Sequence, residues 1–220
     1  MRSSKQTQEA RRPSLKAANA ELSRENKALR RELEERNLEL REALEHQTAT
    51  SEVLSIISRS PTDVQPVLDA IAESAARVCG IDDVVLRLVE GDMEVVRAHF
   101  GPVSVTTGRE ALSIERPNYR WIREHGALHI PDNRAQNEFP DIGAGGNFRT
   151  YLSAPLRQGG EVIGTLTARH FEVRPFTPAQ IKLLETFAEQ AVIAIENVRL
   201  FKELQERNRD LTEALEQQTA

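Results

Sequence analysis

The sequence predicts an α+β fold with two antiparallel β-hairpins, helices around them, and long coiled-coil helices at both ends. Three observations predict this fold: two stretches of alternating apolar residues with glycine turns, helical periodicity on either side of them, and one amphipathic helix that occurs twice. With the flanking helices set aside, about 150 of the 220 residues remain, a usual size for one domain with its own core.

The repeated helix is the clearest organising feature of the chain. Residues 32–49 (ELEERNLELREALEHQTA) recur as residues 203–220 (ELQERNRDLTEALEQQTA), with 13 of 18 positions identical. The first copy continues into the globular part, so we expect the chain to be one unit of a longer linear array. The predicted domains are a disordered polar leader (1–13), an N-terminal coiled-coil helix (14–58), a globular domain (59–198) and a C-terminal coiled-coil helix (199–220).

Both copies are predicted to form a parallel homodimeric coiled coil. Leucine and asparagine alternate at heptad spacing, with leucine at d and asparagine at a, and the four-residue step from Leu29 to Leu33 is a stutter that locally unwinds the supercoil. A buried amide favours the register in which each asparagine meets its twin, usually in a parallel dimer. The alternative is an amphipathic helix that packs on its own domain. The predicted interface residues are Leu15, Asn19, Leu22, Asn26, Leu29, Leu33, Asn37, Leu40, Leu44, Leu204, Asn208, Leu211 and Leu215.

The globular part begins and ends with capped helices. The run Ser60-Pro61-Thr62-Asp63 predicts the start of a helix that Gly80 ends. Thr177 and Gln180 form a capping box, with proline at the first helical position. No proline or glycine follows up to the chain end, so we expect one continuous helix that includes the second copy of the repeat.

Hairpins and short elements fill the space between these helices. Strands are predicted at residues 83–89 and 93–100, and again at 149–156 and 161–171. A short helix follows Pro117, and residues 127–130 form a brief strand. The stretch from Pro131 to Asn147 is long for a simple connection and is rich in Asn, Asp, Gly and Pro.

Composition excludes several classes of partner. The net charge is -5 with both signs interspersed, so neither nucleic acid nor an anionic membrane surface is expected to bind. The single cysteine, Cys79, cannot form an internal disulfide, which favours a reducing, cytoplasmic compartment. No apolar run reaches the 18 residues that a membrane span needs.

Four spaced motifs resemble the second half of a GAF domain. They are YLSAPL from Tyr151, GEVIGTL from Gly160, RPFT from Arg174, and FAEQAVIAIENVRL from Phe187. The resemblance covers about residues 51–200 and implies one antiparallel sheet, with helices on its faces and a small-molecule pocket between sheet and loops. Residues 43–54 resemble the linkers that join GAF domains in large bacterial sensor histidine kinases, which implies an output domain in the same protein.

The resemblance places a ligand under the segment from Pro131 to Asn147. Aromatic walls with a few polar groups are typical of binding pockets, and an arginine there would suit an anionic group. The alternative is that the aromatic residues are ordinary core residues. The predicted ligand-binding residues are Tyr119, Trp121, His129, Asn137, Phe139, Arg149 and Tyr151.

No catalytic or metal-binding constellation is expected, so the chain is predicted not to be an enzyme. His46 is unsuited to be a phosphoacceptor, because Gln217 replaces it in the second copy of the helix. Gly126 interrupts any metal site built on His125 and His129. One cysteine cannot cycle as in the GAF-type methionine sulfoxide reductases, and no covalent bilin is expected; the identity of a non-covalent ligand stays open.

The function predicted from the sequence is a sensory GAF module of a bacterial signalling protein. Binding of a small molecule or partner is expected to reach an output domain through the dimeric coiled coil. The alternative is a ligandless module that dimerises and spaces its neighbours.

Overall fold

The computed structural model describes residues 17–34, 36–37, 63–103, 105, 111–143 and 147–219. Contacts divide the chain into two units, residues 1–47 and 48–220. In the first unit, residues 17–34 and 36–37 are helical with exposed side chains. The expected leader, the interface residues Leu15, Leu40 and Leu44, and the expected cap residues 60–62 lie outside the described residues.

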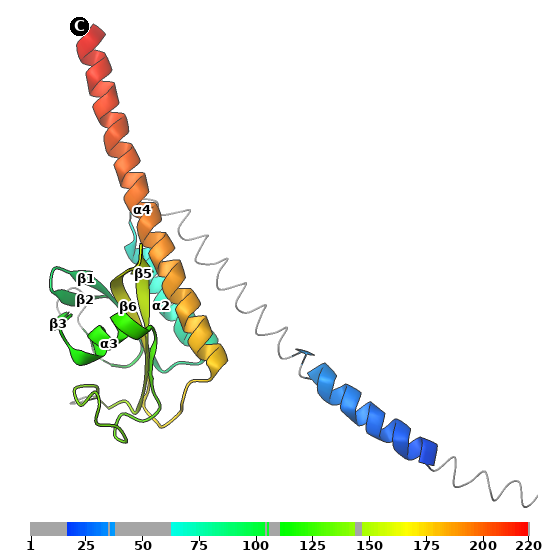
Figure 1. The fold of residues 1–220 in the computed structure, drawn as a ribbon. Coiled ribbons are helices and arrows are strands. Elements are labelled where there is room, and N and C mark those ends of the chain that lie inside the picture. Colours follow the sequence, from blue (N-terminus) through cyan, green and yellow to red (C-terminus); the bar gives the residue numbers. More distant parts are fainter. Residues whose placement is uncertain are drawn as a thin grey trace, which may run out of the picture. The chain divides into compact units, whose positions relative to one another are not determined.

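The second unit is built on a six-stranded sheet in which every neighbouring pair is antiparallel (Figure 1). The strand order is β3-β2-β1-β6-β5-β4, so the central β1–β6 pair joins the two hairpins. The strands are β1 (Asp83–Glu90), β2 (Met93–Phe100), β3 (Ala111–Ser113), β4 (Leu128–Ile130), β5 (Thr150–Gln158) and β6 (Glu161–His170). The α+β fold and both predicted hairpins are confirmed; the three-residue β3 was not predicted.

Three helices complete this unit: α2 (Gln65–Cys79), α3 (Pro117–His125) and α4 (Pro178–Thr219). Gly80 ends α2 in the left-handed conformation, with φ 60°, which glycine adopts without steric cost. The capping box of α4 is present. The backbone N–H of Gln180 donates to Thr177 Oγ1 (3.2 Å), and the backbone N–H of Thr177 donates to Gln180 Oε1 (2.9 Å). The predicted continuous helix is confirmed, because α4 runs unbroken for 42 residues.

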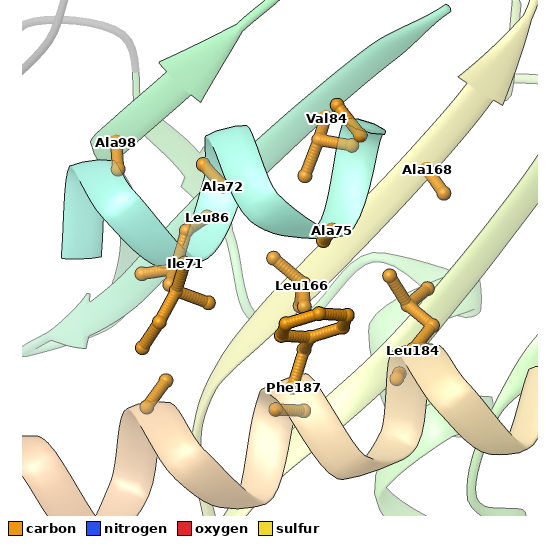
Figure 2. Packing of buried hydrophobic residues seen from close by; sticks show 14 of the residues in the cluster. Ile71, Ala72, Ala75, Val84, Leu86, Ala98, Leu166, Ala168, Leu184 and Phe187 are labelled. Carbon is orange, nitrogen blue, oxygen red and sulfur yellow. The ribbon is translucent and has the colours of Figure 1, made fainter. Parts of the chain in front are cut away.

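Helices α2 and α4 lie side by side on one face of the sheet and form the main core with it (Figure 1). Figure 2 shows Phe187 of α4, Ile71 of α2 and Leu166 of β6 pointing into this core, and all three are fully buried. Each such side chain contributes about 1.5–3 kcal/mol by leaving water. Alanines at the contact, such as Ala75 and Ala168, let the helices approach the sheet closely.

The opposite face of the sheet is covered by α3 and by residues 131–143 with Phe148. A second, smaller cluster fixes this cover, and it consists of Ile122, Leu128, Ile130, Phe139, Ile142 and Tyr151. The cover lies over β4 and β5, at one end of the strand order, and leaves a hollow over the central strands. None of the described helices combines the length and apolar character that crossing a membrane requires.

Candidate functional site

A cavity of about 340 Å³ lies on the sheet face opposite α2 and α4. Four strands supply its floor, and α3 with the segment after Phe139 supplies its walls. The floor residues are Arg87 of β1, Glu94 of β2, Tyr151 and Ser153 of β5, and Thr165, Thr167 and Arg169 of β6. This volume is near the lower end of the range found for small-molecule pockets.

The floor of the cavity is polar and yet buried. Along β6 the residues alternate, with Leu166 and Ala168 facing the core and Thr165 and Thr167 facing the cavity. An antiparallel sheet usually exposes its polar face to water, whereas both threonines here are only 2% exposed. Buried polar groups need hydrogen-bond partners, and most polar side chains of this floor find such partners within the protein.

Glu94 organises one side of the cavity. Its side chain is 2% exposed and accepts a hydrogen bond from Thr165 Oγ1 (2.7 Å) on one oxygen and from Arg116 Nη2 (2.6 Å) on the other. The Arg116 guanidinium thereby neutralises the carboxylate. In the middle of the floor, Ser153 Oγ and Thr167 Oγ1 are hydrogen-bonded at 3.0 Å.

Asp83 organises the other side. It is fully buried and accepts a hydrogen bond from Arg169 Nε (2.7 Å), while Arg169 Nη2 contacts the same oxygen. His99 Nε2 lies 2.9 Å from the second oxygen, which also accepts the Val103 N–H (3.1 Å). The Phe148 ring covers the guanidinium of Arg169, with its centroid 5.3 Å from Cζ, as in a cation–π contact.

Arg87 is the exception to this self-sufficiency. Its Nε is buried and has no hydrogen-bond partner, and no ion pair includes Arg87 among the described residues. Burial lowers the pKa of its guanidinium; Tyr151 and Glu94 oppose the shift, and Arg169 and Arg116 add to it. An arginine nevertheless keeps its proton at neutral pH, so a cation without an acid partner faces the cavity.

Two backbone features set the position of Arg87. The β1–β2 register shifts between Leu86 and Arg87, where Arg97 is the extra residue of β2, and such bulges redirect side chains. On the other edge, β6 approaches so closely that a Cβ on Gly164 would lie 2.1 Å from the Arg87 carbonyl oxygen. Only glycine fits this contact, so the strand geometry around Arg87 depends on Gly164.

Of the residues predicted to bind a ligand, Tyr151 lines the cavity and six are not among its lining residues. Phe139 is buried in the cluster that fixes the cover, and Trp121 packs edge-on against it at 6.4 Å. Tyr119 is buried and donates its hydroxyl to the Val162 carbonyl (3.0 Å). These aromatic residues therefore shape the cover.

The polar residues of that prediction have other surroundings. Arg149 donates to both oxygens of Asp132, at 3.0 and 2.6 Å, and this hydrogen bonding keeps the pKa of Asp132 below its usual value. His129 lies on the α4 side of the sheet, where its Nε2 accepts the Phe176 N–H (3.1 Å). Asn137 is exposed. A ligand role for these residues stays a prediction.

The sequence reasoning missed four charged residues of the cavity lining: Arg87, Glu94, Arg116 and Arg169. One signal could have found two of them, because Arg87 and Arg169 are basic residues within strands, at positions facing away from the core. The partners of Glu94 and Arg169 were not readable, because Arg116 and Asp83 come from other parts of the chain.

Residues 63–195 match the family model described as GAF domain. The fold is similar to the GAF domain of an Acinetobacter phosphoenolpyruvate-protein phosphotransferase, with a TM-score of 0.61, 15% identity, and coverage of 70% of this chain and 94% of that one. It is also similar to residues 122–287 of a methyl-accepting chemotaxis protein (TM-score 0.59, 21% identity, 68% and 98% coverage).

A third similar structure is the phycoerythrobilin-bound GAF domain of a cyanobacterial phytochrome (TM-score 0.61, 14% identity, 70% and 96% coverage). No curated protein matches the sequence. At these identities the structural similarities establish the fold alone.

Proposed function

Because the chain belongs to the GAF domain family, we propose that it is a regulatory module that binds a small molecule in the cavity and passes the effect to α4. GAF domains are typically small-molecule-binding regulatory modules of signalling proteins. Fold membership alone does not assign a function, so the proposal rests on the site. The observation that carries it is the buried polar floor around a cavity of about 340 Å³, where Arg87 Nε lacks a partner.

The proposed ligand is bound without a covalent bond to cysteine. A bilin occupies the phytochrome GAF domain that has the same fold. Here the single cysteine, Cys79, lies at the end of α2 in the core on the other face of the sheet. Burial raises the pKa of its thiol to about 12, which disfavours the reactive thiolate.

The strands offer a short route from the cavity to α4. Ser153 and Thr167 face the cavity, while their neighbours Leu152 and Ala168 pack on the opposite face in the core with α4. A ligand that displaces the floor therefore also displaces residues that support this helix. Packed cores favour discrete rearrangements over continuous deformation, which makes such a shift transmissible.

A second link joins the cavity cover to α4 at the end of β5. Arg157 Nη2 donates to the carbonyl oxygens of Ile122 (3.1 Å) and Arg123 (2.8 Å) in α3. The next residue, Gln158, donates to Glu196 of α4. Replacing Gln158 with leucine should reduce the ligand-induced change in hydrogen exchange of α4 amides, whereas Gln205→Leu, on the exposed part of α4, should leave it unchanged.

The proposed output is a parallel dimer formed by the exposed stripe of α4. The stripe starts inside the domain, where Ile193 is 52% exposed and Leu200 is 45% exposed, and continues along the helix beyond it. The predicted interface residues of the N-terminal helix, from Leu22 onward, each correspond to the residue 171 positions later in the chain. Leu22 thus corresponds to Ile193. The asparagines recur as well, since Asn26 corresponds to Asn197.

The two copies differ where α4 touches its own sheet. Ala194 and Val198 are buried against the domain, and the N-terminal copy has Ser23 and Lys27 at these positions. The repeat therefore retains the exposed stripe while the domain-facing residues change. A leucine-and-asparagine stripe that is kept while the domain-facing residues change supports helix–helix pairing with a second copy of the chain. An output domain following the coiled coil, as in sensor kinases, is part of this proposal.

A thermal-shift screen of the full chain tests ligand binding. The compounds would be nucleotides, haem, tetrapyrroles and small organic acids. A true ligand at 100 times its Kd stabilises the fold by about 2.7 kcal/mol. This stabilisation should shrink in Thr167→Val, in the cavity floor, and persist in the matched control Thr212→Val, on the exposed part of α4.

The second candidate function is a ligandless module that dimerises and spaces its neighbours. The observation that favours it is the internal pairing of the floor, where Glu94, Arg169, Ser153 and Thr167 already have partners. No saturable stabilisation by any compound, with an unchanged dimer, would select this function over the regulatory one.

A further inference from the structure

The charges around the cavity do not balance, and the imbalance is located at one residue. Arg116 is paired with Glu94, and Arg169 is paired with Asp83. Arg87 has no such acid among the described residues, and its Nε is out of contact with solvent. The remaining acid of the lining, Asp141, is exposed at the rim, where solvent screens its charge.

A cation with a donor N–H that is buried without an acceptor destabilises a fold. Its desolvation is not offset by an ion pair, and an unmade hydrogen bond at a buried donor adds to the cost. Such a group is stabilised when a bound anion supplies the missing charge and acceptor. A carboxylate suits a guanidinium best among common organic anions, because its two oxygens match two parallel N–H donors.

The rest of the lining indicates the body of such a molecule. One unpaired positive charge on the protein requires one negative charge on the ligand. A cationic group on the ligand would find no free acid in the floor, because both oxygens of Glu94 already accept hydrogen bonds. The hydroxyl groups of Ser153 and Thr167 suit polar atoms, and Ile122 and Ile142 suit an apolar part. The volume limits the molecule to a small one.

We propose that the ligand is a small organic monoacid whose carboxylate is bound by Arg87. This inference rests on the proposed function, since it names the chemical class of the ligand for the same cavity. It assigns the anion-binding role to Arg87 of β1 in place of Arg149, which the sequence suggested and which is paired with Asp132. The bulge in the β1–β2 pair and the close approach of Gly164 fix the backbone that presents Arg87.

Matched pairs of acid and amide test the proposal on the full chain. Acetate, acetamide, benzoate and benzamide would be titrated into ¹⁵N-labelled protein at constant ionic strength, with amide chemical shifts as the readout. We expect saturable shifts in β1 and β6 with an acid, and binding of its amide at least about 10-fold weaker. A hydrogen bond to a charged group contributes enough that Arg87→Gln should weaken acid binding about 10- to 100-fold.

A matched control removes the same charge elsewhere. Arg77 is exposed on α2, on the other face of the sheet, and pairs with Glu73. Arg77→Gln should leave acid binding unchanged. Arg87→Met separates a binding role from a structural one: without ligand it should unfold at higher urea concentration than the wild type, because it removes a buried Nε donor without an acceptor on a partly buried, unpaired cation.

Each other outcome overturns the inference. Equal binding of acid and amide, or acid binding that survives Arg87→Gln, would remove the anion-binding role and leave the proposed function standing. Unfolding of both Arg87 variants would assign the residue a structural role. If none of the four compounds produces saturable shifts, the monoacid class is wrong, and the broader thermal-shift screen decides separately whether the cavity binds a ligand.

Discussion

Removing either member of the Asp83–Arg169 pair should destabilise the domain strongly, and removing both should cost less than the sum of the two single losses. Asp83 is fully buried, and the Arg169 side chain is 9% exposed, so solvent screens neither charge. Breaking a buried pair from one side costs about 3–5 kcal/mol, because it leaves an uncompensated charge in the interior. We therefore expect this loss of unfolding free energy for Asp83→Asn and for Arg169→Met.

The double variant gives the sharper test. It leaves no isolated charge, so its cost should fall below the sum of the single costs by about 2 kcal/mol or more. Urea denaturation of the three variants at pH 7 measures this coupling. A matched control is the exposed Arg77–Glu73 pair, at 3.3 Å and with side chains 63% and 46% exposed, where Glu73→Gln should cost about 0–1 kcal/mol.

Additive single costs would refute this reasoning. They would mean that His99 and the Val103 N–H alone satisfy Asp83, and that the guanidinium of Arg169 reaches solvent once its partner is lost. The buried polar floor would then not depend on internal charge pairing, and the argument that Arg87 stands out from it would weaken.

Four further predictions concern strand packing, the thiol, a histidine and the coiled coil. Gly164→Ala should destabilise the domain by about 1–3 kcal/mol in urea, because its Cβ would lie 2.1 Å from the Arg87 carbonyl oxygen; wild-type stability would contradict the close approach. Cys79, whose thiol pKa burial raises to about 12, should resist iodoacetamide at pH 8 until urea unfolds the chain, and rapid modification of the native protein would show that the thiol is accessible. Burial, together with the charge of Arg174, lowers the pKa of His170 below 6.5. The unfolded chain therefore binds more protons than the folded one, and the free energy of unfolding should fall as the pH drops below about 6.5. A flat profile of this free energy between pH 5 and 7 in urea titrations would refute the prediction. The double variant Leu204→Glu/Leu211→Glu should be monomeric by light scattering while the wild type is dimeric. Asn197→Leu and Asn208→Leu should stabilise the dimer and loosen the specificity of its oligomeric state. A monomeric wild type would refute the dimer.

Local sequence signals were sufficient for the elements of the fold. Both hairpins, the end of α2 at Gly80 and the capping box at Thr177 follow from residues a few positions apart, because turns and caps are set by neighbouring backbone groups. The same holds for the unbroken α4, which needs only the absence of proline and glycine. β3 escaped prediction because three residues carry too little periodicity to identify a strand.

The candidate site was predictable only in its general place. The sequence indicated a pocket beside the segment that follows β4, and Tyr151 does line the cavity. The sequence predicted that Trp121 and Phe139 line the pocket, and in the structure they pack into the cover. Bulky apolar side chains stabilise a fold most where they leave water completely. Arg149 was the predicted anion-binding residue because of its position beside this segment, but in the structure it forms an ion pair with Asp132.

By itself, the sequence determined the class of fold, the C-terminal end of α2, the start of α4 and the repeated leucine-and-asparagine stripe, because these depend on the order of residues along one element. Only the tertiary structure decided which charges meet. Pairing β1 with β6 brings Asp83 opposite Arg169, and Arg116, which follows β3, meets Glu94 of β2. Electrostatic partners are chosen by distance in space and by burial, and β-strand order sets both without leaving a trace in the local pattern of any one strand.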